Sequence, residues 1–184
     1  MKTLKIIIAL TFIVFFLHIT QAQAFSMKGE KVIGISGVGY YELNSDWESL
    51  YFGFSAAGNT KTAGFGFNVS FELGFSDQIS GEIDLGFNRL VYASRQRAII
   101  KESFFTGDVL GHFYFLQNDT FNPYLIFGVG ALVSSSSVAP VGNVGFGMHF
   151  RITEEFSVKT ELIFKSAVLL NRGEGRVGFA YHFK

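Results

Sequence analysis

Apolar residues occupy every second position in two consecutive segments, residues 63–75 and 79–87, which are joined by the polar residues Ser76, Asp77 and Gln78. Side chains of a β-strand alternate between its two faces, so this period predicts two strands that each have one apolar and one polar face. The short polar link predicts a tight turn and therefore an antiparallel hairpin. Either a protein core or a lipid bilayer must cover the apolar faces.

The same alternation recurs along the rest of the chain and predicts eight strands. They cover residues 31–43, 63–75, 79–88, 105–115, 125–133, 143–152, 158–165 and 176–183. Residues 50–57 also alternate, so a barrel of ten strands is the alternative. The links 76–78, 117–122 and 153–155 are short and polar, whereas the links 44–61, 90–98, 133–139 and 169–173 are mostly longer. Outer-membrane barrels have this asymmetry, with short periplasmic turns and longer extracellular loops.

The first 24 residues have the three parts of a secretory signal peptide. Lys2 and Lys5 precede an apolar run over residues 6–17, and the small residues Ala22 and Ala24 end the segment. A retained anchor helix is the alternative, but the run is short for the about 20 residues that cross a bilayer. We expect a cleaved signal peptide over residues 1–24 and one domain over residues 25–184.

Composition excludes several classes of function. Without Lys2 and Lys5 the chain has 13 basic and 15 acidic residues, and this balance does not indicate a nucleic-acid partner. The absence of Cys excludes disulfides and thiolate metal sites. No continuous apolar run of membrane-spanning length follows residue 24. An exported chain of this kind is therefore either a soluble protein or a β-barrel.

Two features favour a membrane barrel over a soluble sandwich. The chain contains 23 Phe among 184 residues, more large rings than a small soluble core can readily bury. The charged residues within strands lie on the face opposite the Phe-rich one, together with many of the 21 Gly. Side chains fill the interior of an eight-stranded barrel, and lipid would cover its outside. We therefore predict an all-β fold, an antiparallel up-and-down transmembrane β-barrel of eight strands.

Acidic and basic residues of the inward face separate along the chain. The acidic residues of strands two to four are Glu72, Glu82, Asp84 and Asp108, and the basic residues of strands six to eight are Arg151, Lys159, Lys165 and Arg176. In a closed eight-stranded barrel these two sets lie on opposite walls. Unpaired charges in a confined interior are costly, so we predict an ion-pair network that plugs the lumen. The alternative is that several of these charges lie near the rims and are hydrated.

No residue pattern indicates catalysis. His112, His149 and His182 are expected to face inward at a similar depth near the periplasmic end, an arrangement that could bind a metal. Alternate strands separate them, so we interpret them as structural or hydrated. We assign no catalytic, cofactor-binding or metal-binding residue from the sequence.

Aromatic residues near the predicted strand ends are candidates for interfacial belts. Trp47, Tyr51 and Tyr92 lie near one end of the predicted barrel, and Tyr124 and Tyr181 lie near the other. Such belts occur at both membrane interfaces of outer-membrane barrels. These five residues are candidates for the two belts, and ordinary strand packing is the alternative for each of them.

The signal peptide, the eight alternating strands, the segment NPYLIFGVGA at 122–131 and the last strand RVGFAYHF at 176–183 together resemble the small bacterial outer-membrane β-barrels of the OmpA/OmpX-like type. The resemblance covers the whole mature chain and includes no catalytic motif. It implies an aromatic signal near the end of the last strand that the outer-membrane assembly machinery reads. The matching residues here are Phe179, Tyr181 and Phe183.

These observations predict a monomeric, non-enzymatic protein of the cell outer membrane with a plugged or narrow lumen. Its role would be structural or would depend on surface interactions through extracellular loops, and the longest link, residues 44–61, is the first candidate. The sequence does not indicate which ligand these loops would bind. A small pore or a conduit for small or apolar solutes is the second hypothesis, and a lipid A-modifying enzyme is the third. We expect outer-membrane lipid and the outer-membrane assembly machinery as partners, with no cofactor and no nucleic acid.

Overall fold

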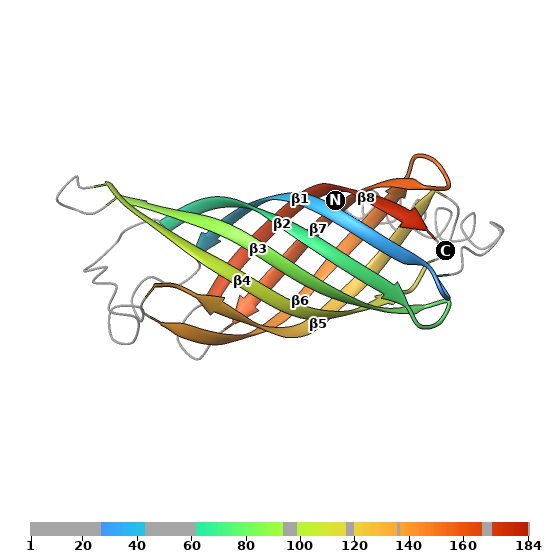
Figure 1. Ribbon diagram of the computed structural model, residues 1–184, viewed down its shortest axis with the longest axis horizontal. Coiled ribbons are helices and arrows are strands. Elements are labelled where there is room, and N and C mark those ends of the chain that lie inside the picture. The colour runs from blue at the N-terminus through green and yellow to red at the C-terminus, as the bar shows by residue number, and fades with distance from the viewer. Residues whose placement is uncertain are drawn as a thin grey trace, which may run out of the picture.

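The computed structural model describes residues 27–42, 62–93, 99–116, 120–135, 137–166 and 171–183. The strands are β1 (Lys31–Glu42), β2 (Thr62–Gly74), β3 (Ile79–Ala93), β4 (Ile99–Tyr114), β5 (Phe121–Val133), β6 (Val138–Arg151), β7 (Phe156–Ser166) and β8 (Asn171–Phe183). Each strand pairs antiparallel with its neighbours in sequence, and β1 pairs with β8, so the sheet is a closed barrel (Figure 1). The prediction of an eight-stranded antiparallel barrel is confirmed.

Three expectations concern segments that lie wholly or mostly outside the described residues. They are the signal peptide over residues 1–24, the alternating segment 50–57 and the long links. Because β1 pairs directly with both β2 and β8, the closed sheet has no place for the two extra strands of the ten-stranded alternative. Most of the long links, including 44–61, also lie outside. Within the described part of the chain, no helix is long and apolar enough to cross a membrane.

Several strands extend further than the sequence pattern predicts. β4 begins at Ile99 instead of residue 105, β6 begins at Val138 instead of residue 143, and β8 begins at Asn171 instead of residue 176. All three additions lie at the end of the barrel with the longer links. The apolar alternation is weak there, for example in Ile99 to Phe104, because polar and apolar residues both occur on each face.

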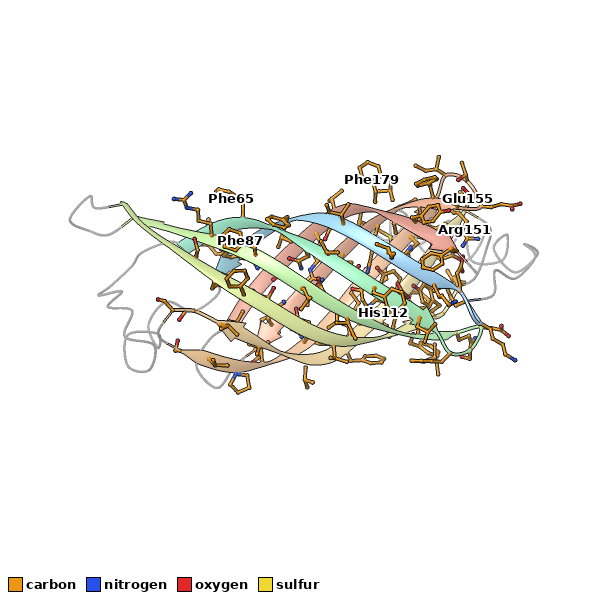
Figure 2. The ribbon with its side chains drawn as sticks, in the orientation of Figure 1. Phe65, Phe87, His112, Arg151, Glu155 and Phe179 are labelled. Carbon is orange, nitrogen blue, oxygen red and sulfur yellow. The ribbon has the colours of Figure 1, made fainter. Side chains whose placement is uncertain are left out.

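The period of two divides the side chains between the lumen and the outer surface. In β3, Glu82 is 1% exposed, whereas Leu85 is 63% exposed. Phe65 and Phe179 project away from the barrel wall (Figure 2). On the outside the rings of Phe67 and Phe87 pack with centroids 6.0 Å apart. The large apolar side chains therefore cover the outside, and polar ones fill the inside.

Two short turns close one end of the barrel. Between β2 and β3, the Ser76 hydroxyl accepts a hydrogen bond from the backbone N–H of Ile79 at 3.0 Å. Between β6 and β7, the Thr153 hydroxyl accepts one from the N–H of Phe156 at 3.0 Å. Serine and threonine stabilise tight turns in this way. Both turns lie at the same end as the C-terminus, which we call the short-turn end (Figure 1).

Gly178 permits a close approach between the strands that close the barrel. It lies opposite Ser36 in the pairing of β8 with β1. A Cβ atom at Gly178 would lie 2.6 Å from the Cα atom of Ser36, and it would also collide with the carbonyl oxygen of Ile35. Gly39 in β1 differs, because a Cβ atom there would have no neighbour within 4 Å.

This contrast gives a matched prediction on the stability of the closed barrel. Gly178→Ala is expected to lower the free energy of unfolding by about 1–3 kcal/mol, because the added methyl group forces the backbones of β1 and β8 apart. Gly39→Ala is expected to change it by less than about 0.5 kcal/mol. Urea titration of protein refolded in detergent micelles, followed by the mobility of unboiled protein on gels, measures both. Equal losses in the two variants would contradict the close approach.

Candidate functional site

Arg176 of β8 is the centre of the buried charges in the lumen. Its guanidinium pairs with Asp84 of β3 and lies 3.4 Å from an oxygen of Asp108 on β4. It also lies 2.6 Å from Glu174 and 3.4 Å from Glu161. One cation thus contacts four carboxylates and reaches from β8 across the lumen to β3 and β4.

Two lysines extend this set along the lumen. The Lys165 ammonium lies 2.5 Å from Asp108 and 3.5 Å from Glu174. The Lys159 ammonium pairs with Glu82 and lies 3.0 Å from Glu161. Each lysine therefore links a carboxylate of β3 or β4 to one of β7 or β8. All of these side chains are buried.

Amide and aromatic groups complete the network. Asn68 and Asn143 each donate a hydrogen bond of 2.9 Å, to Asp84 and Asp108 respectively. Towards the end with the longer links, the guanidinium of Arg172 lies 4.5 Å from the ring centroid of Tyr40 and 5.1 Å from that of Phe104. Cation–π contacts of this kind stabilise a buried guanidinium.

The structure brings together six of the eight residues that the sequence placed in a lumen network. They are Glu82, Asp84, Asp108, Lys159, Lys165 and Arg176. Glu72 lies instead among histidines, and Arg151 pairs with Glu30 near the short-turn end. No ion pair of 4 Å or less joins Glu72 to a lysine or arginine of this set in the described part of the chain.

The expected separation into an acidic wall and a basic wall is wrong. Glu161 on β7 and Glu174 on β8 lie among the basic residues and pair with them. Glu174 and Arg172 were missed because they precede residue 176, where β8 was predicted to begin. The spacing of Arg172, Glu174 and Arg176 continues the period of two, and this signal could have identified them.

A layer of histidines and tyrosines fills the lumen nearer the short-turn end, where His112 lies (Figure 2). One carboxylate oxygen of Glu72 accepts hydrogen bonds from Tyr114 at 2.7 Å, from His112 Nδ1 at 3.1 Å, and from Ser80. His149 Nε2 lies 3.8 Å from the other oxygen of Glu72. The layer therefore gathers around the Glu72 carboxylate.

The expectation that alternate strands keep the histidines apart is wrong for His149 and His182. Their ring centroids are 5.7 Å apart, and the Ser157 hydroxyl lies between them, 3.1 Å from His149 Nδ1 and 2.7 Å from His182 Nε2. The barrel is narrow enough for side chains on β6 and β8 to meet across the intervening strand. His182 Nδ1 also contacts Glu30 at 3.1 Å.

One of the predicted belt residues faces the lumen. Tyr124 is fully buried, and its hydroxyl donates a hydrogen bond of 2.8 Å to Glu161. The outward positions of β5 are Leu125 and Phe127, so Tyr124 has the inward phase. Tyr181 does face outward, with its ring centroid 5.0 Å from that of Phe156. Trp47, Tyr51 and the side chain of Tyr92 lie outside the described residues.

The residues of the expected assembly signal lie on the outward face of β8. Phe179 and Tyr181 are exposed, and Phe183 stacks on Tyr181 with ring centroids 6.1 Å apart. They form an aromatic stripe near the short-turn end.

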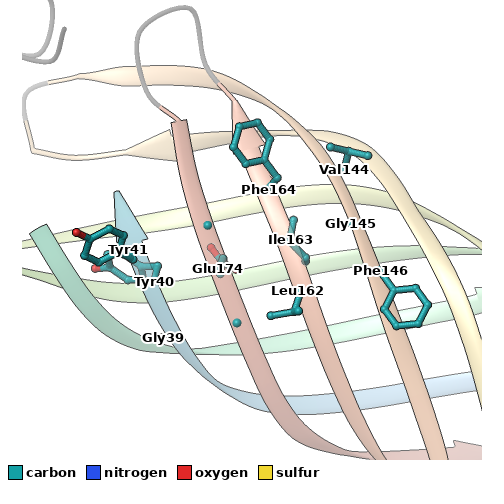
Figure 3. A pocket seen from close by; sticks show the side chains of 12 residues that line it. Gly39, Tyr40, Tyr41, Val144, Gly145, Phe146, Leu162, Ile163, Phe164 and Glu174 are labelled. Atoms are coloured by element: carbon teal, nitrogen blue, oxygen red, sulfur yellow. The ribbon is translucent and has the colours of Figure 1, made fainter. Parts of the chain in front are cut away.

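An apolar depression of about 800 Å³ opens on the outer surface. Gly39 of β1 lies opposite Gly175 of β8, and the absence of side chains at this pair leaves a hollow beside Leu162 and Phe164 of β7 (Figure 3). Tyr41 forms another part of its lining. Most of the lining residues belong to the apolar outer surface. Glu174 also lines the depression, but its side chain is buried and pairs with Arg172 and Arg176.

The central position of Arg176 predicts a large effect of its removal. Arg176→Gln should lower the free energy of unfolding by about 3–5 kcal/mol, because several buried carboxylates lose their shared cation. The control Arg89→Gln, on the exposed face of β3, should change it by less than about 0.5 kcal/mol. Urea titration of refolded protein measures both values. A loss below about 1 kcal/mol for Arg176→Gln would show that the carboxylates do not depend on this cation.

Comparison with known proteins identifies the fold. No family model and no curated protein matches the chain. Among solved structures it is similar to the Neisserial surface protein A (12% identity, 85% of this chain, 100% of that chain, TM-score 0.61). It is also similar to the outer membrane protein OprG from Pseudomonas aeruginosa (12% identity, 89% of this chain, 98% of that chain, TM-score 0.59). A third similar structure is Ail, the attachment invasion locus protein of Yersinia pestis (18% identity, 85% of this chain, 99% of that chain, TM-score 0.59). The chain therefore has the fold of the small eight-stranded β-barrels of bacterial outer-membrane proteins.

Proposed function

We propose that this protein is an integral outer-membrane barrel with a lumen closed by side chains, and that its role is structural or depends on surface interactions through the links at the end opposite the short turns. The observation that carries the proposal is the buried ionic network around Arg176, which crosses the lumen from β8 to β3 and β4. A barrel of this kind occupies the membrane without providing an aqueous path.

The outer surface supports the membrane location. Exposed large apolar side chains occur on every strand, including Ile35, Phe65, Val129 and Phe179. Soluble monomers rarely expose apolar patches larger than a few hundred Å². A band around the whole barrel suits the hydrocarbon region of a bilayer. The similar structures named above, among them an outer membrane protein, support the same assignment.

Burial of the network supports a closed lumen. Asp108, Lys165 and Arg176 face the lumen, and each is at most 3% exposed. A water-filled pore would hydrate such side chains. A small pore, or a conduit for small or apolar solutes, is the alternative that a conductance measurement distinguishes.

The surface role rests on the asymmetry of the two ends. Short turns close one end, and the longer links, including residues 44–61, join the strands at the other. Loops on a rigid scaffold commonly carry binding sites. Two of the similar structures are named as a surface protein and as an attachment invasion protein, which supports a role in surface interactions. The proposal includes no catalytic site, and it assigns Phe179, Tyr181 and Phe183 to recognition by the outer-membrane assembly machinery.

Membrane fractionation tests the location. The chain is expressed with its own N-terminal segment in a Gram-negative host, and the fractions are compared on boiled and unboiled gels. We expect the protein in the outer-membrane fraction with a heat-dependent mobility. Recovery in the soluble periplasmic fraction would contradict the proposal, since the apolar outer surface would then contact protein.

Lipid contact predicts that the cost of an outward charge depends on depth. Leu85→Arg, at the middle of β3, should lower stability in phospholipid vesicles by about 2–4 kcal/mol. Ile152→Arg, beside the β6–β7 turn, should cost at most about 1 kcal/mol, because arginine there reaches the interface. Urea titration of vesicle-folded protein measures both. Equal costs at the two positions would argue against a bilayer around the barrel.

The closed lumen predicts an absence of conductance. Wild-type protein in planar lipid bilayers should give no stable current steps, whereas the double variant Glu82→Ala/Asp84→Ala should give steps and unfold at lower urea concentration, because Lys159 and Arg176 lose partners on β3. The control Glu154→Ala/Glu155→Ala, in the exposed β6–β7 turn, should behave as wild type. Stable steps in the wild type would support the pore, and a double variant without any change would contradict the plug.

A further inference from the structure

We propose that the lumen contains a binding site for one divalent transition-metal ion, best suited to Zn²⁺, formed by Glu72, Glu82 and His112. One potential ligand atom from each of Glu72, Glu82 and His112 lies within 4.8 Å of the other two. All three side chains are buried, where the histidine layer meets the ionic network. The site is independent of the proposed surface role.

The strand pairing itself creates a need for a cation at this site. Glu72 of β2 lies directly opposite Glu82 of β3 on the same inward face. Like charges in such a cross-strand pair destabilise a sheet. Lys159 pairs with Glu82, but no Lys or Arg of the described residues lies within 4 Å of Glu72. Among the described side chains, only histidines lie within ion-pair distance of this carboxylate.

The balance of charges in the lumen also indicates a need for a cation. Its buried carboxylates, apart from the Glu30 that pairs with Arg151, are Glu72, Glu82, Asp84, Asp108, Glu161 and Glu174. Its buried cations are Lys159, Lys165, Arg172 and Arg176. With every carboxylate counted as ionised and the histidines as neutral, six carboxylates against four cations leave two negative charges among the described side chains. A single divalent ion at Glu72 would balance them where the excess lies.

Two carboxylate oxygens of this cluster, Glu72 Oε2 and Glu82 Oε1, have no hydrogen-bond partner among the described residues. Unpaired buried polar atoms are costly unless something binds them. Two carboxylates and one imidazole form a set of three protein ligands that zinc accepts, with its fourth position left open. Calcium and magnesium, which take six or more oxygen ligands, do not suit it.

The ring nitrogen of His112 that faces the site is Nδ1. It lies 3.1 Å from Glu72 Oε1, so an ion bound by both residues would replace the proton of this hydrogen bond. His149 Nε2 lies beside the site, 3.8 Å from the other oxygen of Glu72. A metal-binding histidine is neutral, so binding of the ion releases this proton.

The test measures zinc in folded protein. Untagged wild-type protein is refolded from urea into detergent micelles with equimolar Zn²⁺, passed over a desalting column, and analysed by inductively coupled plasma mass spectrometry. Metal is present during folding, so access to the closed lumen does not limit binding. We expect one zinc per chain in the band that migrates as folded protein on unboiled gels. Folded wild-type protein without zinc would overturn the proposal.

Matched variants assign the ligands. Glu72→Gln and His112→Gln should each weaken zinc binding by about 100-fold or more, since loss of a partner of a metal-bound histidine alone costs 10–100-fold. Glu174→Gln makes the same carboxylate-to-amide change nearer the end with the longer links, and this variant should bind zinc as the wild type does. If one ligand variant fails to fold, the other still tests the site. Wild-type affinity in a folded ligand variant would overturn the assignment.

Cobalt provides a readout of the donor set. Co²⁺ bound in place of zinc should give visible absorption bands typical of four-coordinate nitrogen and oxygen ligation, and His112→Gln should abolish them. Bands that persist unchanged in folded His112→Gln would show that the ion binds elsewhere.

Discussion

Closure of the sheet by the pairing of β1 with β8 is the constraint on which the rest of the structure depends. An open sheet would leave a row of unpaired backbone groups at each edge, and lipid offers no water to satisfy them. The pairing extends from Lys31 opposite Phe183 to Glu42 opposite Arg172, the whole length of β1. Gly178 allows the two strands to approach at Ser36. Once eight strands are closed, the lumen is narrow, and every inward side chain must find a partner across it.

The ionic lumen also helps to fix the register of the strands. A shift by one residue would move every charge to the outer surface and every large apolar ring into the lumen. With inward residues such as Asp84, Asp108 and Arg176, such a shift is prohibitively costly, whereas an apolar lumen would make the two faces similar. Apolar residues of equal volume can stabilise a core as well as buried ion pairs do. The advantage of the charges here is therefore the specificity of the barrel over shifted alternatives.

The fold could be predicted from the sequence because apolar and polar residues alternate along the strands. Every strand repeats the alternation well enough to assign its faces, and polar links such as Ser76 to Gln78 mark the turns. The prediction failed where the signal weakened, in the first residues of β8, so Arg172 and Glu174 were missed. It misplaced Tyr124 because an aromatic residue near a strand end was interpreted by type and not by its inward phase. The contacts between strands, such as Glu72 with His112, depend on register and stagger, which the period does not determine.

The order of the layers along the barrel connects the closed lumen with the inferred metal site. From the short-turn end, the histidine layer around Glu72 comes first, then Lys159 with Glu82 and Glu161, and then the contacts of Arg176. A cation that moved from the long-link end would have to pass Arg172, Lys165 and Arg176 together with the carboxylates that they pair with, and these side chains fill the lumen. A metal ion at Glu72 must therefore enter from the short-turn end or during folding. Such an ion would be a structural component of the barrel and not a transported solute, so the metal site and the plug are compatible within one lumen.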